Sequence, residues 1–134
     1  MSYFTLKEFI RSSIADAQGF DNTPDFVEVE NLRQLVTKIL DPLRKSYGHP
    51  LIVTSGYRCL QLNKAVGGAV NSQHMTGQAA DIVPKSRDPQ EIRKLFVMVQ
   101  RLGLPFDQLI NEHNYSWIHV SYGPRNRRQV LQLP

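Results

Sequence analysis

Two histidines and an aspartate have the residue types and spacing from which a metal site can be built. His74 lies seven residues before Asp81, and Gly77 between them can adopt the positive φ that a chain reversal needs. His119 lies between two apolar residues of an expected strand, so its side chain points to the face opposite theirs. If that face lines a cleft, the two imidazoles and the carboxylate meet there. The set then leaves a fourth tetrahedral position for water, as in a catalytic zinc site.

Hydrolysis at such a site also needs a proton acceptor and, for a substrate with a free carboxylate, a cation. Glu112 is the acid nearest in sequence to His119 and can pass a proton from water to a leaving amine, with His113 as the alternative. Arg58 can grip a carboxylate through two parallel hydrogen bonds. Cys59 follows it, but a fourth protein ligand would close the site to water, so neither metal binding nor nucleophilic attack is expected of its thiol. Each of these residues also has an ordinary structural role open to it.

The elements that must position these residues alternate between helices and strands. Apolar residues at helical spacing predict three helices, which span residues 5–18, 25–48 and 88–103. Short apolar runs bounded by turn residues predict four strands, which span residues 51–54, 78–84, 106–112 and 116–123. Residues 62–74 are expected to form a loop. This order predicts an α+β domain, with an antiparallel sheet and helices packed on one side.

Local signals at the helix ends refine this expectation. Thr5 and Glu8 fit a capping box at the start of the first helix. Pro42 should kink the second helix, and Gly48 should end it. Asp88 fits the N-cap of the third helix.

Length and composition limit the class of protein. The 134 residues, 41% of them hydrophobic, fit one domain with a single core. No apolar run reaches the roughly 18 residues of a transmembrane helix, so no membrane partner is expected. The N-terminus lacks the basic and apolar regions of a signal peptide, and synthesis in a cytoplasm is expected. The single cysteine excludes an intramolecular disulfide and a Cys-based zinc site.

The net charge of +4 is concentrated near the C-terminus, where Arg125, Arg127 and Arg128 lie close together. We expect residues 125–134 to form a solvated basic tail after a domain at residues 1–124. A basic tail can contact nucleic acid or an anionic cell wall. The sequence contains no zinc-finger, RNP or helix-turn-helix signature, so no nucleic-acid partner is expected.

Four segments together resemble a known family. SQHMTGQAADI resembles the Ser-x-His-x-x-Gly-x-Ala-x-Asp motif of the zinc D-Ala-D-Ala carboxypeptidase family, whose relatives include D-Ala-D-Ala dipeptidases, L-Ala-D-Glu phage endolysins and the hedgehog signalling domain. VTSGYRC, FDQLINE and WIHVSY resemble its Ser-Gly-Tyr-Arg turn, its approach strand and its Trp-x-His segment, in the right order. The likeness runs from about Tyr3 to Tyr122, and the short form is similar to small phage and prophage members. It implies the hedgehog-like and D,D-peptidase-like fold.

The resemblance also implies roles for individual residues. It implies that His74, Asp81 and His119 bind Zn²⁺ and that Arg58 grips the substrate. Ser72, the first residue of the His motif, is implied to support the substrate or the metal site by hydrogen bonding.

The general base departs from the commonest family pattern. Many members have an acid three residues before the last ligand histidine, where this chain has Ser116. Glu112 fits the pattern of hedgehog-like and small phage-like members, and we expect it to be catalytic. The departure leaves open a catalytically silent zinc module of a phage or prophage structural component.

The resemblance therefore implies a zinc-dependent, D,D-carboxypeptidase-like metallopeptidase that cuts peptidoglycan stem peptides. Cleavage of D-Ala-D-Ala and an endolysin-type cut between L-Ala and D-Glu need the same parts, and both stay open. A monomer is expected. Without a signal peptide, the protein is expected to reach the cell wall through holin pores or after lysis.

Overall fold

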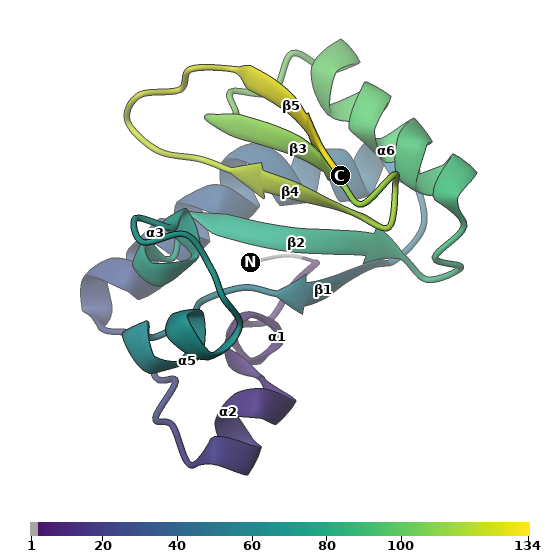
Figure 1. The fold of residues 1–134 in the computed structure, drawn as a ribbon. Coiled ribbons are helices and arrows are strands. Elements are labelled where there is room, and N and C mark those ends of the chain that lie inside the picture. The colour runs from purple at the N-terminus through teal and green to yellow at the C-terminus, as the bar shows by residue number, and fades with distance from the viewer. Residues whose placement is uncertain (1–2) are drawn as a thin grey trace.

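A five-stranded sheet lies at the centre of the computed structural model, which describes residues 3–134 (Figure 1). The strands are β1 Leu51–Ser55, β2 Ala79–Pro84, β3 Gln108–Glu112, β4 Trp117–Ser121 and β5 Gln129–Leu133. Their order across the sheet is β1-β2-β4-β3-β5. The first four strands pair antiparallel, and β5 pairs parallel to β3. The expected α+β class is confirmed, with a sheet that is mostly antiparallel.

Helices surround this sheet unevenly. They are α1 Leu6–Ile10, α2 Ser13–Gln18, α3 Phe26–Leu35, α4 Asp41–Tyr47, α5 Leu60–Ala65 and α6 Pro89–Arg101. In the view of Figure 1, α3, α4 and α6 lie behind the sheet, whereas α1, α2 and α5 lie below its β1 edge. Within residues 3–134, no helix is both long enough and apolar enough to cross a bilayer.

The core fills the space between the sheet and the helices behind it. Alternation along the strands turns Ile82, Leu109, Ile118 and Val120 into this core, where none has exposed surface. The matching helix residues are fully buried as well: Leu32, Leu35, Ile39, Leu40, Leu43, Ile92 and Leu95. The intervening strand residues face the other way and are free to form a site.

The expected helix over residues 5–18 is wrong, because the chain forms two short helices there. Helix α1 ends at Ile10, and α2 begins at Ser13. The break is stabilised by Ser12, whose side chain accepts a hydrogen bond from the backbone N–H of Ala15 at 3.1 Å and so caps α2. Thr5 makes no side-chain capping bond, so the expected capping box is wrong too.

The helix expected over residues 25–48 forms, with a π-helical turn at Val36–Leu40 between α3 and α4. The turn comes directly before Pro42, and the N–H of Asp41 donates to the carbonyl of Val36, five residues back. Proline lacks an N–H and clashes with the carbonyl four residues before it, and a π turn accommodates both defects. Gly48 ends α4 at φ 80°, as predicted.

Two segments expected to be irregular contain regular structure. The expected loop at residues 62–74 includes most of α5 and the start of a 3₁₀ turn at Gln73–Thr76. The C-terminal residues, expected to be a solvated tail, include β5. The four strands and the helix predicted at residues 88–103 form within one or two residues of the expected bounds, and Asp88 caps α6.

Candidate metal centre and catalytic cleft

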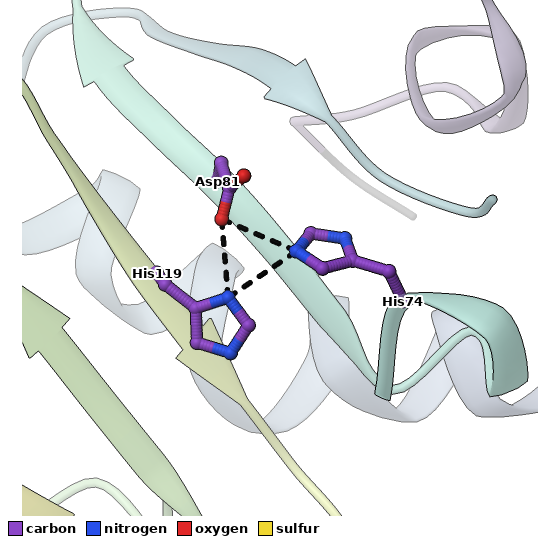
Figure 2. A group of neighbouring side chains, drawn as sticks. All are labelled: His74, Asp81 and His119. Carbon is purple, nitrogen blue, oxygen red and sulfur yellow. Dashed lines mark hydrogen bonds and ion pairs between the residues drawn. The ribbon is translucent and has the colours of Figure 1, made fainter. Parts of the chain in front are cut away.

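His74, Asp81 and His119 lie together in one buried cluster (Figure 2). His74 Nε2 is 3.2 Å from Asp81 Oδ1 and 3.2 Å from His119 Nδ1, and the third side of the triangle, His119 Nδ1 to Asp81 Oδ1, is 3.1 Å. Figure 2 shows the three side chains pointing toward one another from the 3₁₀ turn, β2 and β4. The structure thus brings together the three residues that the sequence singled out.

Strand pairing places two of these side chains. Asp81 on β2 lies directly opposite His119 on β4, and directly paired residues project to the same face of a sheet. Their strand neighbours Ala80, Ile118 and Val120 point into the core. The expected orientation of His119, opposite to its two apolar neighbours, is therefore confirmed.

The 3₁₀ turn places the third side chain. Ser72 caps this turn, because its Oγ accepts a hydrogen bond from the backbone N–H of His74 at 3.2 Å. Gly77 ends the turn at φ 74°, and a Cβ there would collide with the carbonyl oxygen of Glu28. Only glycine combines that conformation with that close approach. The spacing between His74 and Asp81 thus reflects one short turn followed by a reversal into β2.

The protonation of His74 is fixed by its surroundings. Its Nδ1 lies 2.7 Å from the carbonyl oxygen of Gly56, which can only accept, so Nδ1 carries a proton and donates it. Burial lowers the pKa of His74, against the opposing charge of Asp81, so the ring is neutral at neutral pH. His74 Nε2 therefore directs a lone pair at Asp81 Oδ1.

Asp81 is ionised in the same cluster. Burial opposes its ionisation, but His74 and His119 hold the pKa of this carboxyl far below its ordinary range. Two lone-pair-bearing atoms, on His74 and Asp81, thus face each other. His119 Nδ1 carries at most one hydrogen, so it can donate to only one of them. A cation at the centre of the triangle would satisfy all three atoms at once.

Zinc fits this donor set. Two ligand atoms at the usual distance of about 2.0–2.1 Å from a tetrahedral zinc are separated by roughly 3.3 Å. The three separations in the cluster are 3.1, 3.2 and 3.2 Å. His74 also has the outer hydrogen bond to a carbonyl that is usual for a metal-binding histidine. Three protein ligands leave the fourth position for water or substrate.

Arg58 lies beside the cluster and is held in place by neighbours. Its Nη2 is 3.9 Å from Asp81 Oδ2, and its Nε donates to Ser55 Oγ at 3.2 Å. Its Nη1 donates to Asn63 Oδ1 at 2.9 Å. Burial lowers the pKa of Arg58, whereas the charges of Asp81 and Glu112 raise it. An arginine remains charged under such conditions, so the site contains a fixed cation next to the metal position.

Asn63 is a site residue that the sequence reasoning missed. It is buried, and besides accepting from Arg58 it donates from Nδ2 to the carbonyl of Ala69 at 2.9 Å. Gly68 packs against both side chains, and a Cβ at that position would collide with Asn63 Oδ1. The signal available in the sequence is the polar Asn63 close to the glycine pair Gly67-Gly68, within the segment expected to form a loop.

Glu112 and His113 differ in their relation to this site. Glu112 lies two residues along β3 from Ile110, the direct partner of His119, so Glu112 and His119 share one face. Burial raises the pKa of Glu112, as does the charge of Asp81, whereas the nearby histidines lower it. His113 lies in the exposed turn after β3, with its ring centroid 4.9 Å from that of Trp117. Ser116 lies in the same turn and donates to the carbonyl of His113.

Two hollows open beside the cluster, and we name them the first and second hollow. The first has a volume of about 810 Å³, and its lining includes Ser12, Ile14, Val53, Thr54, Asp81 and Trp117. The second has a volume of about 550 Å³, and its lining includes Ser72, His74, Gln108, His119, Arg125 and Leu133. Arg58 and Glu112 line both. The cation and the acid therefore stand where the two hollows meet.

Residues 2–121 match the model of a known family, Peptidase M15. The chain belongs to the Peptidase M15 family. Its peptidase activity class implies a hydrolytic enzyme, and the zinc dependence of M15 peptidases agrees with the buried cluster of His74, Asp81 and His119. No curated protein matches the sequence. The M15 match includes all the residues discussed above from Arg58 to His119 and ends before β5.

Cys59 has a structural place in this M15 domain. Its sulfur accepts a hydrogen bond from the backbone N–H of Leu62 at 3.4 Å and so caps α5. Its backbone N–H donates to Asn22 Oδ1 at 2.7 Å. The thiol does not belong to the cluster that could hold a metal.

Proposed function

We propose that the protein is a zinc metallopeptidase that hydrolyses peptide bonds in peptidoglycan stem peptides. The observation that carries the proposal is the triangle of donor atoms, whose sides of 3.1–3.2 Å match those expected around tetrahedral zinc. Membership of the Peptidase M15 family supports the reaction class. The resemblance of the motifs to D-Ala-D-Ala carboxypeptidases supports the substrate class.

Three side chains would hold the zinc ion, and other groups act on the substrate and on protons. His74, Asp81 and His119 would hold the ion through Nε2, Oδ1 and Nδ1 respectively. When bound, zinc supplies Lewis-acid polarisation of the scissile carbonyl and of a water. The hydrogen bond from His74 to Gly56 keeps the coordinating nitrogen unprotonated and the ring correctly oriented.

Glu112 is assigned the proton transfers. Its carboxylate takes a proton from the attacking water as the new C–O bond forms, and it returns that proton to the amine nitrogen as the C–N bond breaks. Its raised pKa suits both steps, because a carboxyl whose pKa lies nearer to neutral accepts and releases a proton more readily at neutral pH. Its position where the hollows meet gives it access to a substrate lying in either.

We assign to Arg58 the binding of the substrate carboxylate. Its guanidinium is fixed by Ser55 and Asn63 and lines both hollows. A bidentate pair with a carboxylate fixes both the position and the direction of a bound peptide. A carboxypeptidase cut at D-Ala-D-Ala and an endopeptidase cut between L-Ala and D-Glu both place a carboxylate near the reacting bond.

A single experiment tests the proposal and names the bond. The pentapeptide L-Ala-γ-D-Glu-L-Lys-D-Ala-D-Ala is incubated with protein that has been stripped by chelator, with the same protein after zinc is restored, and with Glu112→Gln protein. Mass spectrometry of the products distinguishes release of D-Ala from release of L-Ala. Cleavage by the zinc-restored wild type alone supports the proposal. Full zinc occupancy without cleavage of this peptide or of purified peptidoglycan contradicts it and favours a catalytically silent zinc module.

A further inference from the structure

The segment after β4 has a defined structure, although it lies outside the residues matched by the M15 family. Strand β5 pairs with β3 along its full length, from Gln108 opposite Gln129 to Glu112 opposite Leu133. In Figure 1, β5 lies along the outer side of β3. The segment is thus fixed to the same strand that bears Glu112.

An ion pair between the buried carboxylate of Asp107 and the partly exposed Arg127 anchors the loop that leads into β5. Asp107 has no exposed surface, and its two oxygens accept from Arg127 Nε at 2.9 Å and Arg127 Nη2 at 3.1 Å. The backbone N–H of Arg127 donates to the same carboxylate at 3.0 Å. Gln73, which precedes His74, donates to it as well at 2.9 Å. Asp107 therefore connects the C-terminal segment to the turn that bears a proposed metal ligand.

Arg125 adds a second cation to this single carboxylate. It contacts Asp107 Oδ2 only at 3.4 Å, and its side chain is 62% exposed. The unit charge of Asp107 is matched by the two short hydrogen bonds from Arg127, so the charge of Arg125 is in excess. Arg125 lines the second hollow together with His74 and His119. A cation with N–H groups directed to solvent therefore stands on the wall of the cleft.

We propose that this segment forms a substrate subsite, in which Arg125 binds a carboxylate of an acidic peptide. The inference rests on the proposed function and narrows its substrate class to peptides with a second carboxylate besides the one at Arg58. A guanidinium recognises a carboxylate through two parallel hydrogen bonds, which a carboxamide cannot match. In a stem peptide whose C-terminal carboxylate lies at Arg58, the free α-carboxylate of a D-Glu linked through its γ-carboxyl is such a group.

The test compares two peptides that differ by one group. The first is L-Ala-γ-D-Glu-L-Lys-D-Ala-D-Ala, and the second has the D-Glu α-carboxylate converted to a carboxamide. Dissociation constants are measured by calorimetry on zinc-loaded Glu112→Gln protein, and KM and kcat on protein with Glu112 intact. Each constant is measured in protein with Arg125 intact and in protein carrying Arg125→Gln or Arg125→Lys. Arg128→Gln is the matched control, because it removes the same charge from a residue that does not line the hollow and that donates to the carbonyl of Gly103.

We expect Arg125→Gln to raise the dissociation constant and KM of the free-acid peptide about tenfold, the usual effect of losing a charge-assisted hydrogen bond. For the carboxamide peptide, Arg125→Gln should change the dissociation constant and KM less than twofold. The value of kcat should stay unchanged, and Arg125→Lys should restore part of the lost affinity for the free-acid peptide. Equal weakening of both peptides by Arg125→Gln, no weakening of either, or equal weakening by Arg128→Gln overturns the subsite.

The subsite and the proposed function fail in different ways. Binding of the free-acid peptide that Arg125→Gln weakens supports the subsite even if no bond is cut. If the free-acid and carboxamide peptides are hydrolysed with the same KM and kcat, the subsite is overturned but the proposed peptidase activity is retained. A zinc-loaded protein that binds neither peptide and does not cleave purified peptidoglycan overturns both.

Discussion

Asp81 and His119 are direct partners on adjacent antiparallel strands, with Asp81 Oδ1 3.1 Å from His119 Nδ1. The register of β2 against β4 therefore sets two of the three donor atoms, and the 3₁₀ turn brings the third, His74 Nε2. A shift of one residue in that register would turn Asp81 into the apolar core. The metal centre therefore forms only when β2 and β4 pair in this register.

Removal of one ligand should abolish stoichiometric metal binding. We expect His74→Ala and His119→Ala to lose zinc, because two remaining ligands cannot complete a stable tetrahedral site. Asp81→Ala should bind zinc more weakly by a large factor. Elemental analysis after dialysis gives the zinc content per chain, and His49→Ala is the control, because His49 is exposed and outside the cluster. One zinc per chain in the His119→Ala protein would show that the ligand set is wrong.

Glu112→Gln should separate chemistry from metal binding. The amide keeps the size of the side chain and an accepting oxygen but cannot take up a proton. A general acid–base group contributes roughly 10²–10⁴-fold, so turnover should fall at least about a hundredfold with normal zinc content. His113→Ala should cost much less, because His113 is exposed in the turn beyond β3. Near wild-type turnover in Glu112→Gln, with an inactive His113→Ala protein, would move the base to His113.

Asn63→Ala should impair substrate binding rather than catalysis. The substitution removes the oxygen that accepts from Arg58 Nη1, so the guanidinium loses one of its fixed contacts. We expect KM for peptides with a C-terminal carboxylate to rise several-fold, up to about tenfold, with zinc content and kcat little changed. Gln61→Ala on the same helix is the control, since Gln61 is exposed. A fall in kcat with constant KM would remove Asn63 from the role of positioning Arg58.

Asp107 should make the protein sensitive to acid. Its hydrogen bonds from Arg127 lower the pKa of this carboxyl from 3.8 to about 2. A lowered carboxyl pKa stabilises the fold at pH values above the unfolded pKa, and that contribution disappears as the pH falls from about 4 to about 2. Its size is on the order of 2 kcal/mol.

Urea unfolding of metal-free protein at pH 6 and pH 3 measures the effect of Asp107 without competition from zinc. The free energy of unfolding should fall more steeply with acid in the wild type than in Asp107→Asn, which has lost the titrating group. Asp16→Asn, in which an exposed aspartate is replaced, controls for the change in charge. Parallel acid profiles for wild type and Asp107→Asn would contradict the prediction.

Cys59→Ser should retain both zinc and activity. The sulfur caps α5 and lies outside the metal cluster, and a serine hydroxyl is itself a good helix N-cap. Zinc content and turnover of the Cys59→Ser protein are the measurements. A large loss of either would give the thiol a role that its position at the start of α5 does not indicate.

The sequence predicted the elements with strong periodicity and the residues with distinctive chemistry. Helix α6 has an N-cap, an N1 proline and a long apolar stripe, and it forms as expected. His74, Asp81 and His119 could be grouped because their residue types are uncommon at such spacings. The break between α1 and α2 and the existence of α5 were not predicted, because helices of six residues or fewer are too short to show separate periodic signals.

The remaining features depend on tertiary contacts. The basic residues around Arg127 predicted a solvated tail, and nothing in the local sequence shows that buried Asp107, twenty residues earlier, receives that arginine. Strand β5 forms because the edge of β3 is available to it, which is a property of the whole sheet. Asn63 was missed for a similar reason, since its importance lies in the partner that the fold provides, Arg58.

Strand β5 has a consequence for solubility. Strand β3 pairs with β4 on one side and with β5 on the other. A chain shortened to residues 1–121, where the M15 match ends, would expose the backbone N–H and C=O groups along the second side of β3. An open, flat edge of this kind accepts strands from other molecules. In the full chain β5 is the edge strand instead. Loss of the C-terminal segment would in addition leave the buried carboxylate of Asp107 without its arginines, so the shortened chain should unfold more readily and precipitate at concentrations at which the full chain stays dispersed.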